Sequence, residues 1–272
     1  NNGHGMKTDL LVIDVSNLCY RAYHAIGAAR GDAPGSAADV SYSFLHTLVR
    51  LRKHFGTERF AFCFDHPVSY RKQIFTEYKQ KRHEVDPEAA KKRAQLHQQI
   101  IKLGKLHLPR LGFSNIFRAR GMESDDLMAA IALACPKDDQ VVLVTSDNDL
   151  LQCLRKNVTL YSPATRKVTT RDNFMETYGI EPKQWADVKA MAGCATDGVP
   201  GILGVGEQGA MKFLRGELKP TSSQYIWITC KKGQRMIAGC SRLVKLPFTD
   251  CPVPDIHEDD QIHWEQIDRI RL

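Results

Sequence analysis

Short apolar runs alternate with longer segments of helical periodicity along the first 170 residues. A buried strand is predicted at residues 10–14, further strands at 60–65 and 141–145, and short strands at 116–119, 159–161 and 167–169. Apolar positions recur every three or four residues in the predicted helices, which span 36–54, 87–108, 125–134 and 182–192. Because strands alternate with helices, the pattern predicts an α/β fold built on a mostly parallel sheet.

The pattern changes after about residue 172. Glycines cluster between Gly193 and Gly209, and helices without a clear buried strand follow. The segment 224–230 suits a strand or a helix equally well. We therefore predict an α/β catalytic domain over residues 6–171 and a smaller helical region with a C-terminal tail over residues 172–272.

Composition places the chain among globular proteins. It has 272 residues, of which 43% are apolar and 25% charged, enough for a buried core. No apolar run approaches the roughly 18 residues of a membrane helix, and none near the start resembles a secretory signal. The eight cysteines form no C-x-x-C pair, which favours reduced thiols and disfavours a zinc site. We expect a cytoplasmic monomer with no membrane partner.

The net charge of +7 is unevenly distributed. Residues 71–110 hold eleven Lys or Arg and four Asp or Glu. Three aromatic residues, Tyr70, Phe75 and Tyr78, lie among the cations Arg71, Lys72, Lys79, Lys81 and Arg82. A solvated helix face would explain the charge alone. Aromatic rings between cations favour a surface that binds nucleic acid, with Arg71, Lys72 and Lys81 as phosphate contacts.

Carboxylates follow the ends of the predicted strands. Asp14 and Asp65 end apolar runs, Asp147 and Asp149 follow another, and a cluster begins the helix near residue 125. Ligands of open parallel sheets bind beyond the carboxyl ends of the strands, so these acids are predicted to share one edge. The full predicted set is Asp14, Asp65, Glu123, Asp125, Asp126, Asp147, Asp149 and Asp197. So many carboxylates require a divalent cation, and oxygen donors favour Mg²⁺ or Mn²⁺ over Zn²⁺.

Each acidic motif also has an ordinary structural explanation. A single Asp after a strand is usually a cap or turn residue. Residues 123–126 fit a capping box that opens a helix, and residues 147–149 fit an Asx turn. The metal-site interpretation depends on the recurrence of acids at the same kind of position, just after a strand, in several separate segments.

A glycine-rich hairpin at residues 199–206 separates the helix 182–192 from a second helix at 207–214. Such a loop lets backbone N–H groups approach a phosphate, next to the positive end of the second helix. A tight turn between helices is the alternative. The predicted DNA contacts of this hairpin are Gly201, Gly204, Gly206 and Lys212.

Together these motifs resemble the 5′-nuclease or flap endonuclease family, which includes bacteriophage 5′–3′ exonucleases and the 5′-nuclease domain of bacterial DNA polymerase I. The resemblance covers about residues 9–214, with a shorter match at 241–247. The resemblance is based on the segments 13–17, 20–24, 64–65, 77–82, 123–126, 145–149 and 193–206.

The resemblance implies a PIN-like core, a helical arch over about residues 70–110 and a helix–hairpin–helix that grips duplex DNA. It implies two or three Mg²⁺ ions, for which Mn²⁺ can substitute, and K⁺ in the hairpin. The first metal site would use Asp14, Asp65, Glu123, Asp125 and Asp126. The second would use Asp147, Asp149 and Asp197. The implied reaction is hydrolysis of DNA, or of RNA in hybrids, near the 5′ ends of branched or nicked duplexes.

The resemblance also assigns roles to cationic and aromatic residues. Tyr78, Lys79 and Arg82 match residues that orient the scissile phosphate, and Arg21 falls in a segment near the active site. We therefore predict these four as catalytic residues.

One position departs from the family pattern, which reads Gly-Asp-x-x-Asp. Here Cys194 follows Gly193 and precedes Asp197, and a thiol is a poor ligand for Mg²⁺. Gly198 replaces an Asn, which is a milder change. A structure-specific DNA-binding protein with weakened catalysis is therefore an alternative. A PIN-type ribonuclease or a phosphatase is a second alternative, disfavoured by the hairpin and the basic arch.

Overall fold

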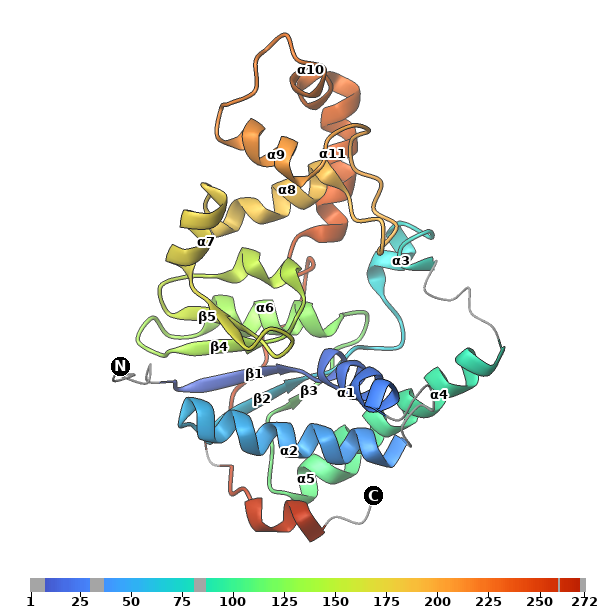
Figure 1. Ribbon diagram of the computed structural model, residues 1–272, viewed down its shortest axis with the longest axis vertical. Coiled ribbons are helices and arrows are strands. Elements are labelled where there is room, and N and C mark those ends of the chain that lie inside the picture. The colour runs from blue at the N-terminus through green and yellow to red at the C-terminus, as the bar shows by residue number, and fades with distance from the viewer. Residues whose placement is uncertain (1–7, 30–36, 81–86, 259, 270–272) are drawn as a thin grey trace.

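The predicted strands form one sheet in the computed structural model, which describes residues 8–29, 37–80, 87–258 and 260–269 (Figure 1). The strand order is β3-β2-β1-β4-β5-β6. Neighbouring strands are parallel except β5 and β6, which are antiparallel. The strands are β1 Leu10–Asp14, β2 Phe60–Cys63, β3 Ile116–Phe117, β4 Val141–Val144, β5 Val158–Ser162 and β6 Lys167–Thr169. The predicted α/β class with a mostly parallel sheet is confirmed.

The helices include every one that the periodicity predicts. They are α1 Val15–Ala29, α2 Ala37–Phe55, α3 Tyr70–Ile74, α4 Pro87–Lys102, α5 Leu108–Arg110, α6 Ser124–Ala134, α7 Arg171–Tyr178, α8 Trp185–Ala192, α9 Glu207–Leu214, α10 Ser223–Thr229 and α11 Lys231–Val244. The predicted helix 87–108 is divided, because a π-helical turn at Leu103–His107 joins α4 to α5. Residues 223–229 are helical, and the Ser222 hydroxyl accepts a hydrogen bond from the Tyr225 N–H at the start of α10.

Helices cover both faces of the sheet, as a parallel sheet requires (Figure 1). Leu11 and Ile13 belong to the apolar core beneath α1, α2 and α4. Leu10 and Val12 belong to the opposite core, which includes α6 and extends into α7, α8 and α9. The alternation along β1 therefore assigns successive side chains to the two layers.

The helices after β6 pack on the second of these cores, and α8 packs against α11. The last part of the chain then returns to the opposite layer, where the His263 N–H donates to the Leu111 carbonyl (2.9 Å) and the Trp264 ring packs on Phe60 and Phe113. The domain boundary near residue 171 stays a prediction. No helix in the described part of the chain is both long and apolar enough to cross a membrane.

The topology gives β1 a special position. The chain proceeds from β1 to β2 and β3 on one side, whereas β4 and β5 lie on the other side. The carboxyl end of β1 is therefore the point where the strand order reverses, which is where open α/β sheets bind ligands. Asp14 is the last residue of this strand.

Candidate active site

Asp14 is held in a fixed orientation at the switch point of the sheet. The residue is 6% exposed. One oxygen, Oδ1, accepts hydrogen bonds from the Asn17 backbone N–H (3.0 Å) and the Ser124 hydroxyl (3.2 Å). The other, Oδ2, accepts from the Thr145 hydroxyl (3.0 Å). These three donors lie within three residues of predicted acids in the chain, but the sequence pattern alone does not predict their role.

The acids after the other strand ends act on Asp14 and on one another. Burial, together with the nearby charges of Asp65 and Asp147, raises the pKa of Asp14 to about 7. Burial also raises the pKa of Asp149 to about 6, with Asp147 and Asp197 adding to the effect. The predicted gathering of acids from separate segments at one edge is therefore present. Burial and the like charges nearby outweigh the Lys189 ammonium, which lowers the pKa of Asp149.

The start of α6 brings further carboxylates to this edge. The Ser124 backbone N–H donates to Asp65 Oδ1 (2.9 Å), which ties the end of β2 to the helix. Asp125 Oδ1 is buried without a hydrogen-bond partner among the described residues. Burial and the adjacent charge of Asp126 raise the pKa of Asp125 well above its usual value. Asp125 therefore offers an unused oxygen.

Asp126 has a different role from the one that the sequence predicts. Both of its oxygens bind the Arg71 guanidinium (2.6 and 2.7 Å), and they also accept the backbone N–H groups of Glu123 (3.0 Å) and Phe248 (2.7 Å). Asp126 is 0% exposed. With its oxygens used in this way, Asp126 is not available as a metal ligand. Its bond to the Glu123 N–H is instead part of the capping box at the start of α6.

Arg71 is therefore also placed differently from its predicted role as a DNA contact. Its side chain is buried, with 1% of the residue exposed. Besides Asp126, its guanidinium donates to the backbone carbonyls of Leu243 (2.7 Å) and Lys245 (3.4 Å). These bonds leave it directed into the protein. Arg71 joins α3, α6 and the end of α11 rather than a nucleic-acid surface.

Glu123 binds two polar side chains of the segment that follows α3. It accepts hydrogen bonds from the Tyr78 hydroxyl (3.1 Å) and the Lys79 ammonium (2.6 Å) at the same oxygen, Oε2. Burial alone would raise the pKa of Glu123, but the charges of Lys79 and Arg71 outweigh it and lower that pKa. The Tyr78 residue is 3% exposed, so its ring is unavailable for stacking on a base. The Lys79 backbone N–H donates to the Asp197 carbonyl (2.8 Å), which links this segment to the hairpin region.

Outside the hairpin, the remaining basic residues of the prediction are Lys72, Lys81, Arg82 and Arg21. Lys81 and Arg82 lie outside the described residues. Lys72 is partly exposed on α3. Arg21 lies on α1 and donates to the Pro163 carbonyl (3.1 Å), beyond β5. The catalytic role of Arg21 stays a prediction.

The glycine-rich hairpin presents open backbone at two of its three predicted contacts. A Cβ atom at Gly201 would lie 2.3 Å from the Gly193 backbone nitrogen, so this glycine serves close packing. At Gly204 and Gly206 a Cβ would meet nothing within 4 Å. Leu203 is 96% exposed at the tip, and Lys212 is exposed on α9. A partner can therefore approach the backbone around Gly204 and Gly206.

A lysine that the sequence analysis missed lies between the acids and the hairpin. The Lys189 ammonium on α8 lies 3.5 Å from Asp149 Oδ1 and 2.9 Å from Glu207 Oε1. Only the packing of α8 beside residues 148–153 reveals this position, because nothing in the local sequence distinguishes Lys189 from a surface lysine. An internal cation thus lies where the sequence predicts a second metal site.

The chemistry of the edge fits an oxygen-seeking divalent cation. Asp125 has an unused buried oxygen, and the pKa values of Asp14 and Asp149 are raised. Within the described ranges, however, no three Asp, Glu, His or Cys side chains are arranged to hold an ion by themselves. Mg²⁺ usually keeps several of its waters, so it does not require a complete set of protein ligands.

Comparison with known proteins agrees with this architecture. A family model described as 5′-3′ exonuclease, N-terminal resolvase-like domain, matches residues 9–179. The 5′-3′ exonuclease of Aquifex aeolicus is 29% identical over an alignment of 276 positions, which covers 98% of this chain and 90% of the relative. DNA polymerase I of Pseudomonas aeruginosa is 31% identical over 215 residues, which are 77% of this chain but only 22% of the polymerase.

Solved structures show the same fold. The bacteriophage T5 5′-exonuclease superposes with a TM-score of 0.73 at 21% identity, over 88% of this chain and 90% of that one. The catalytic core of Rad2 gives a TM-score of 0.53 at 16% identity, over 84% and 67% of the two chains. The family model covers more than half of the chain, so this protein belongs to the family of the 5′-3′ exonuclease N-terminal resolvase-like domain.

Proposed function

We propose that this protein is a Mg²⁺-dependent, structure-specific 5′-nuclease that hydrolyses DNA near the 5′ ends of flaps and nicks. The observation that carries this proposal is the set of carboxylates around Asp14 at the switch point, beside a hairpin with open backbone at Gly204 and Gly206. Relatives support it, since the T5 5′-exonuclease is known with divalent metal ions and a T5 flap endonuclease with DNA and metal ions.

The metal ligands in this proposal come from the strand ends and the start of α6. They are Asp14, Asp65, Glu123, Asp125, Asp147, Asp149 and Asp197. When bound, Mg²⁺ would lower the pKa of a water and offset negative charge on the phosphate. Mn²⁺ is proposed to substitute, and K⁺ at the hairpin stays a prediction from the resemblance.

The protein's own side chains position these groups. Ser124, Thr145 and the Asn17 N–H fix the two oxygens of Asp14, so this carboxylate needs no reorientation when a substrate binds. Lys79 shares an oxygen of Glu123 with Tyr78 and is partly exposed, so its ammonium can turn from that carboxylate to a phosphate oxygen. We assign Lys79 to neutralising the phosphate and Tyr78 to holding Glu123.

The hairpin and α9 would hold the duplex. Backbone N–H groups around Gly204 and Gly206 are proposed to contact phosphates, with Lys212 one turn into α9. These contacts carry no sequence information, which agrees with recognition of a junction rather than of a sequence.

A labelled 5′-flap substrate with Mg²⁺ tests the proposal. Cleavage near the junction that is lost in Asp147→Asn would support it, and an RNA flap on DNA would measure whether hybrids are accepted. If neither the parent chain nor any variant cuts or binds a flap, the proposal is wrong. Gel filtration of the same preparation would test the proposed monomer.

A DNA-binding protein with weakened catalysis is a second candidate, which the Lys189 position favours. The ammonium of Lys189 already pairs with Asp149, and Cys194 stands where the family pattern has a carboxylate. Flap binding without cleavage, together with cleavage restored by Cys194→Asp, would establish this candidate.

A further inference from the structure

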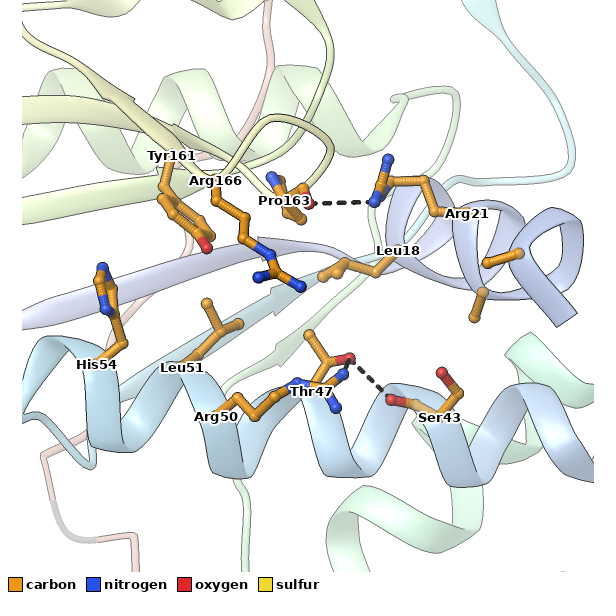
Figure 2. Close-up of a pocket in the computed structure, with 12 residues that line it drawn as sticks. Leu18, Arg21, Ser43, Thr47, Arg50, Leu51, His54, Tyr161, Pro163 and Arg166 are labelled. Atoms are coloured by element: carbon orange, nitrogen blue, oxygen red, sulfur yellow. Dashed lines mark hydrogen bonds between the residues drawn. The ribbon is translucent and has the colours of Figure 1, made fainter. Parts of the chain in front are cut away.

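A pocket beside α1 has no residue other than Arg21 among those predicted to take part in the reaction. It lies between α1, α2 and the turn that joins β5 to β6, and its volume is about 530 Å³ (Figure 2). That volume is in the range of small-molecule sites, roughly 300–1,000 Å³.

The lining of the pocket is basic. Arg21 comes from α1, Arg50 and His54 from α2, and Arg166 from the β5–β6 turn, and no Asp or Glu lines the pocket. Within the described ranges none of these three arginines makes an ion pair with a carboxylate. Cations gathered without counter-charge repel one another, which favours an anionic ligand.

The arginines keep donors available for such a ligand. Arg21 uses one hydrogen bond to the Pro163 carbonyl (3.1 Å), and Arg50 uses one to the Thr47 hydroxyl (2.7 Å). A guanidinium has five N–H donors in a planar fork that suits phosphate oxygens. Figure 2 shows the Arg166 guanidinium extending from the turn into the pocket, towards α2. The neutral partners of Arg21 and Arg50 therefore hold these side chains without cancelling their charge.

One wall of the pocket is aromatic. The rings of His54 and Tyr161 lie 5.7 Å apart and are tilted by 37°. Both line the pocket together with Leu18 and Leu51. A flat ring can lie against such a wall while an attached phosphate contacts the arginines. The combination is typical of a site for a nucleotide rather than for a bare inorganic ion.

The pocket is connected to the acidic edge along α1 and through the residues that follow β4 and end β5. The Asn17 side-chain carbonyl accepts the Ser146 N–H (3.1 Å), and the Ser146 and Ser162 hydroxyls lie 3.4 Å apart just before the turn. Arg21 lies seven residues beyond Asp14, and a rise of 1.5 Å per residue places it about 10 Å further along the helix. A nucleic-acid strand at the acidic edge could therefore reach the pocket within a few nucleotides.

We propose that this pocket binds the phosphate of a nucleotide at a second site, separate from the acidic edge. The ligand chemistry is a phosphate joined to a base-bearing sugar, either within a DNA strand or as a free mononucleotide. The inference rests on the proposed nuclease function only if the bound phosphate belongs to a DNA strand.

The test compares the parent, a pocket variant and a control variant under the same conditions. The double variant Arg50→Gln/Arg166→Gln removes two pocket cations. The control Lys53→Gln/Lys137→Gln removes two exposed cations that do not line the pocket. Fluorescence anisotropy would measure the Kd of labelled flap DNA with Ca²⁺ over a series of salt concentrations, and calorimetry would measure binding of deoxyadenosine 5′-monophosphate. Flap cleavage by the parent with Mg²⁺ is recorded in the same series.

If the ligand is a DNA strand, the pocket variant raises the Kd about tenfold and lowers the salt slope by about 0.9 for each lost phosphate contact, while the control does neither. If the ligand is a free nucleotide, the parent binds the monophosphate, the pocket variant does not, and DNA affinity is unchanged. If the pocket variant matches the control with both ligands, the inference is overturned. Parent cleavage in that case shows that the nuclease proposal survives, so the two failures are distinguishable.

Discussion

The Arg71 guanidinium and the Asp126 carboxylate form a bidentate ion pair, with oxygen–nitrogen distances of 2.6 and 2.7 Å, in the interior of the protein. The pair connects α3 to the first turn of α6, which also carries Asp125 and follows the N-cap residue Glu123. The Phe248 N–H completes it from the chain after α11, and the Arg71 guanidinium lies over the Phe248 ring. The pair therefore fixes the helix end from which the neighbouring acids reach the active site.

Removing one partner of this pair should destabilise the protein strongly. Arg71→Met leaves the Asp126 carboxylate buried without its counter-ion, and losses of about 3–5 kcal/mol are typical of such changes. Urea unfolding of the parent and variant at one pH would measure the difference. Arg71→Met/Asp126→Leu removes both charges and should lose less stability than the two single variants added together. Additive losses would contradict the pairing.

The same pair predicts how Asp126 differs from the proposed metal ligands. Because its oxygens are occupied, Asp126→Asn should lower the Tm while leaving the Mg²⁺ concentration for half-maximal cleavage nearly unchanged. Asp147→Asn should leave the Tm nearly unchanged and raise the Mg²⁺ concentration for half-maximal cleavage, since Asp147 is exposed at the acidic edge. A large Mg²⁺ shift in Asp126→Asn without a change in Tm would restore Asp126 as a ligand.

Lys79 should act on turnover rather than on binding. Its ammonium is held at Glu123 (2.6 Å), beside the acids of the edge. Lys79→Ala should lower single-turnover cleavage about 10²–10³-fold, the loss found for one preorganised donor, with flap affinity nearly intact. Single-turnover kinetics with anisotropy on the same substrate would separate the two. Weaker binding with an unchanged rate would exclude this role.

The raised pKa of Asp14 predicts a pH-dependent stability in the absence of divalent ions. Its pKa is about 7 in the folded protein, against 3.8 as the ordinary value. Between these values the folded state binds more protons than the unfolded state, so stability decreases as pH rises through this window. Thermal unfolding in EDTA should show a Tm that falls between pH 5 and pH 8, and Mg²⁺ should raise the Tm more at pH 8.

Asp14→Asn tests the origin of that dependence. It should flatten the decline of Tm with pH in EDTA, because the titrating group is gone. Asp138→Asn, an exposed acid far along the chain from the site, serves as the control and should keep the decline. A decline that persists unchanged in Asp14→Asn would assign it to other groups.

The sequence predicts the sheet well because the signals are local. Runs such as residues 10–14 and 141–144 are buried on both faces, so they stand out as continuous apolar segments. The acids that follow them meet at one edge because parallel strands end together. The helix α1 escapes prediction, since its apolar positions directly continue the β1 run with no intervening turn.

The errors come from contacts that join distant segments. Arg71 looks like a member of a basic surface until Asp126, which lies 55 positions away, is placed against it. Tyr78 looks like a stacking residue until Glu123 and the α8–α11 layer bury it. Charge patterns identify a group as ionisable, but only packing decides whether its partner is solvent, DNA or another side chain.

Cys194 gives the last prediction, which concerns the second metal site. Its thiol contacts the Thr196 hydroxyl (3.1 Å), and Lys189 places an ammonium between Asp149 and Glu207 nearby. A carboxylate at position 194 would add a hard oxygen ligand, so Cys194→Asp should lower the Mg²⁺ concentration for half-maximal flap cleavage by about tenfold. Mg²⁺ titrations of the parent, Cys194→Asp and Cys194→Ser would measure this. Cys194→Ser keeps the size and the hydrogen bond of the cysteine and, unlike Cys194→Asp, adds no negative charge. It should therefore behave like the parent. If it improves Mg²⁺ use as much as Cys194→Asp, the thiol itself and not the missing carboxylate limits the site.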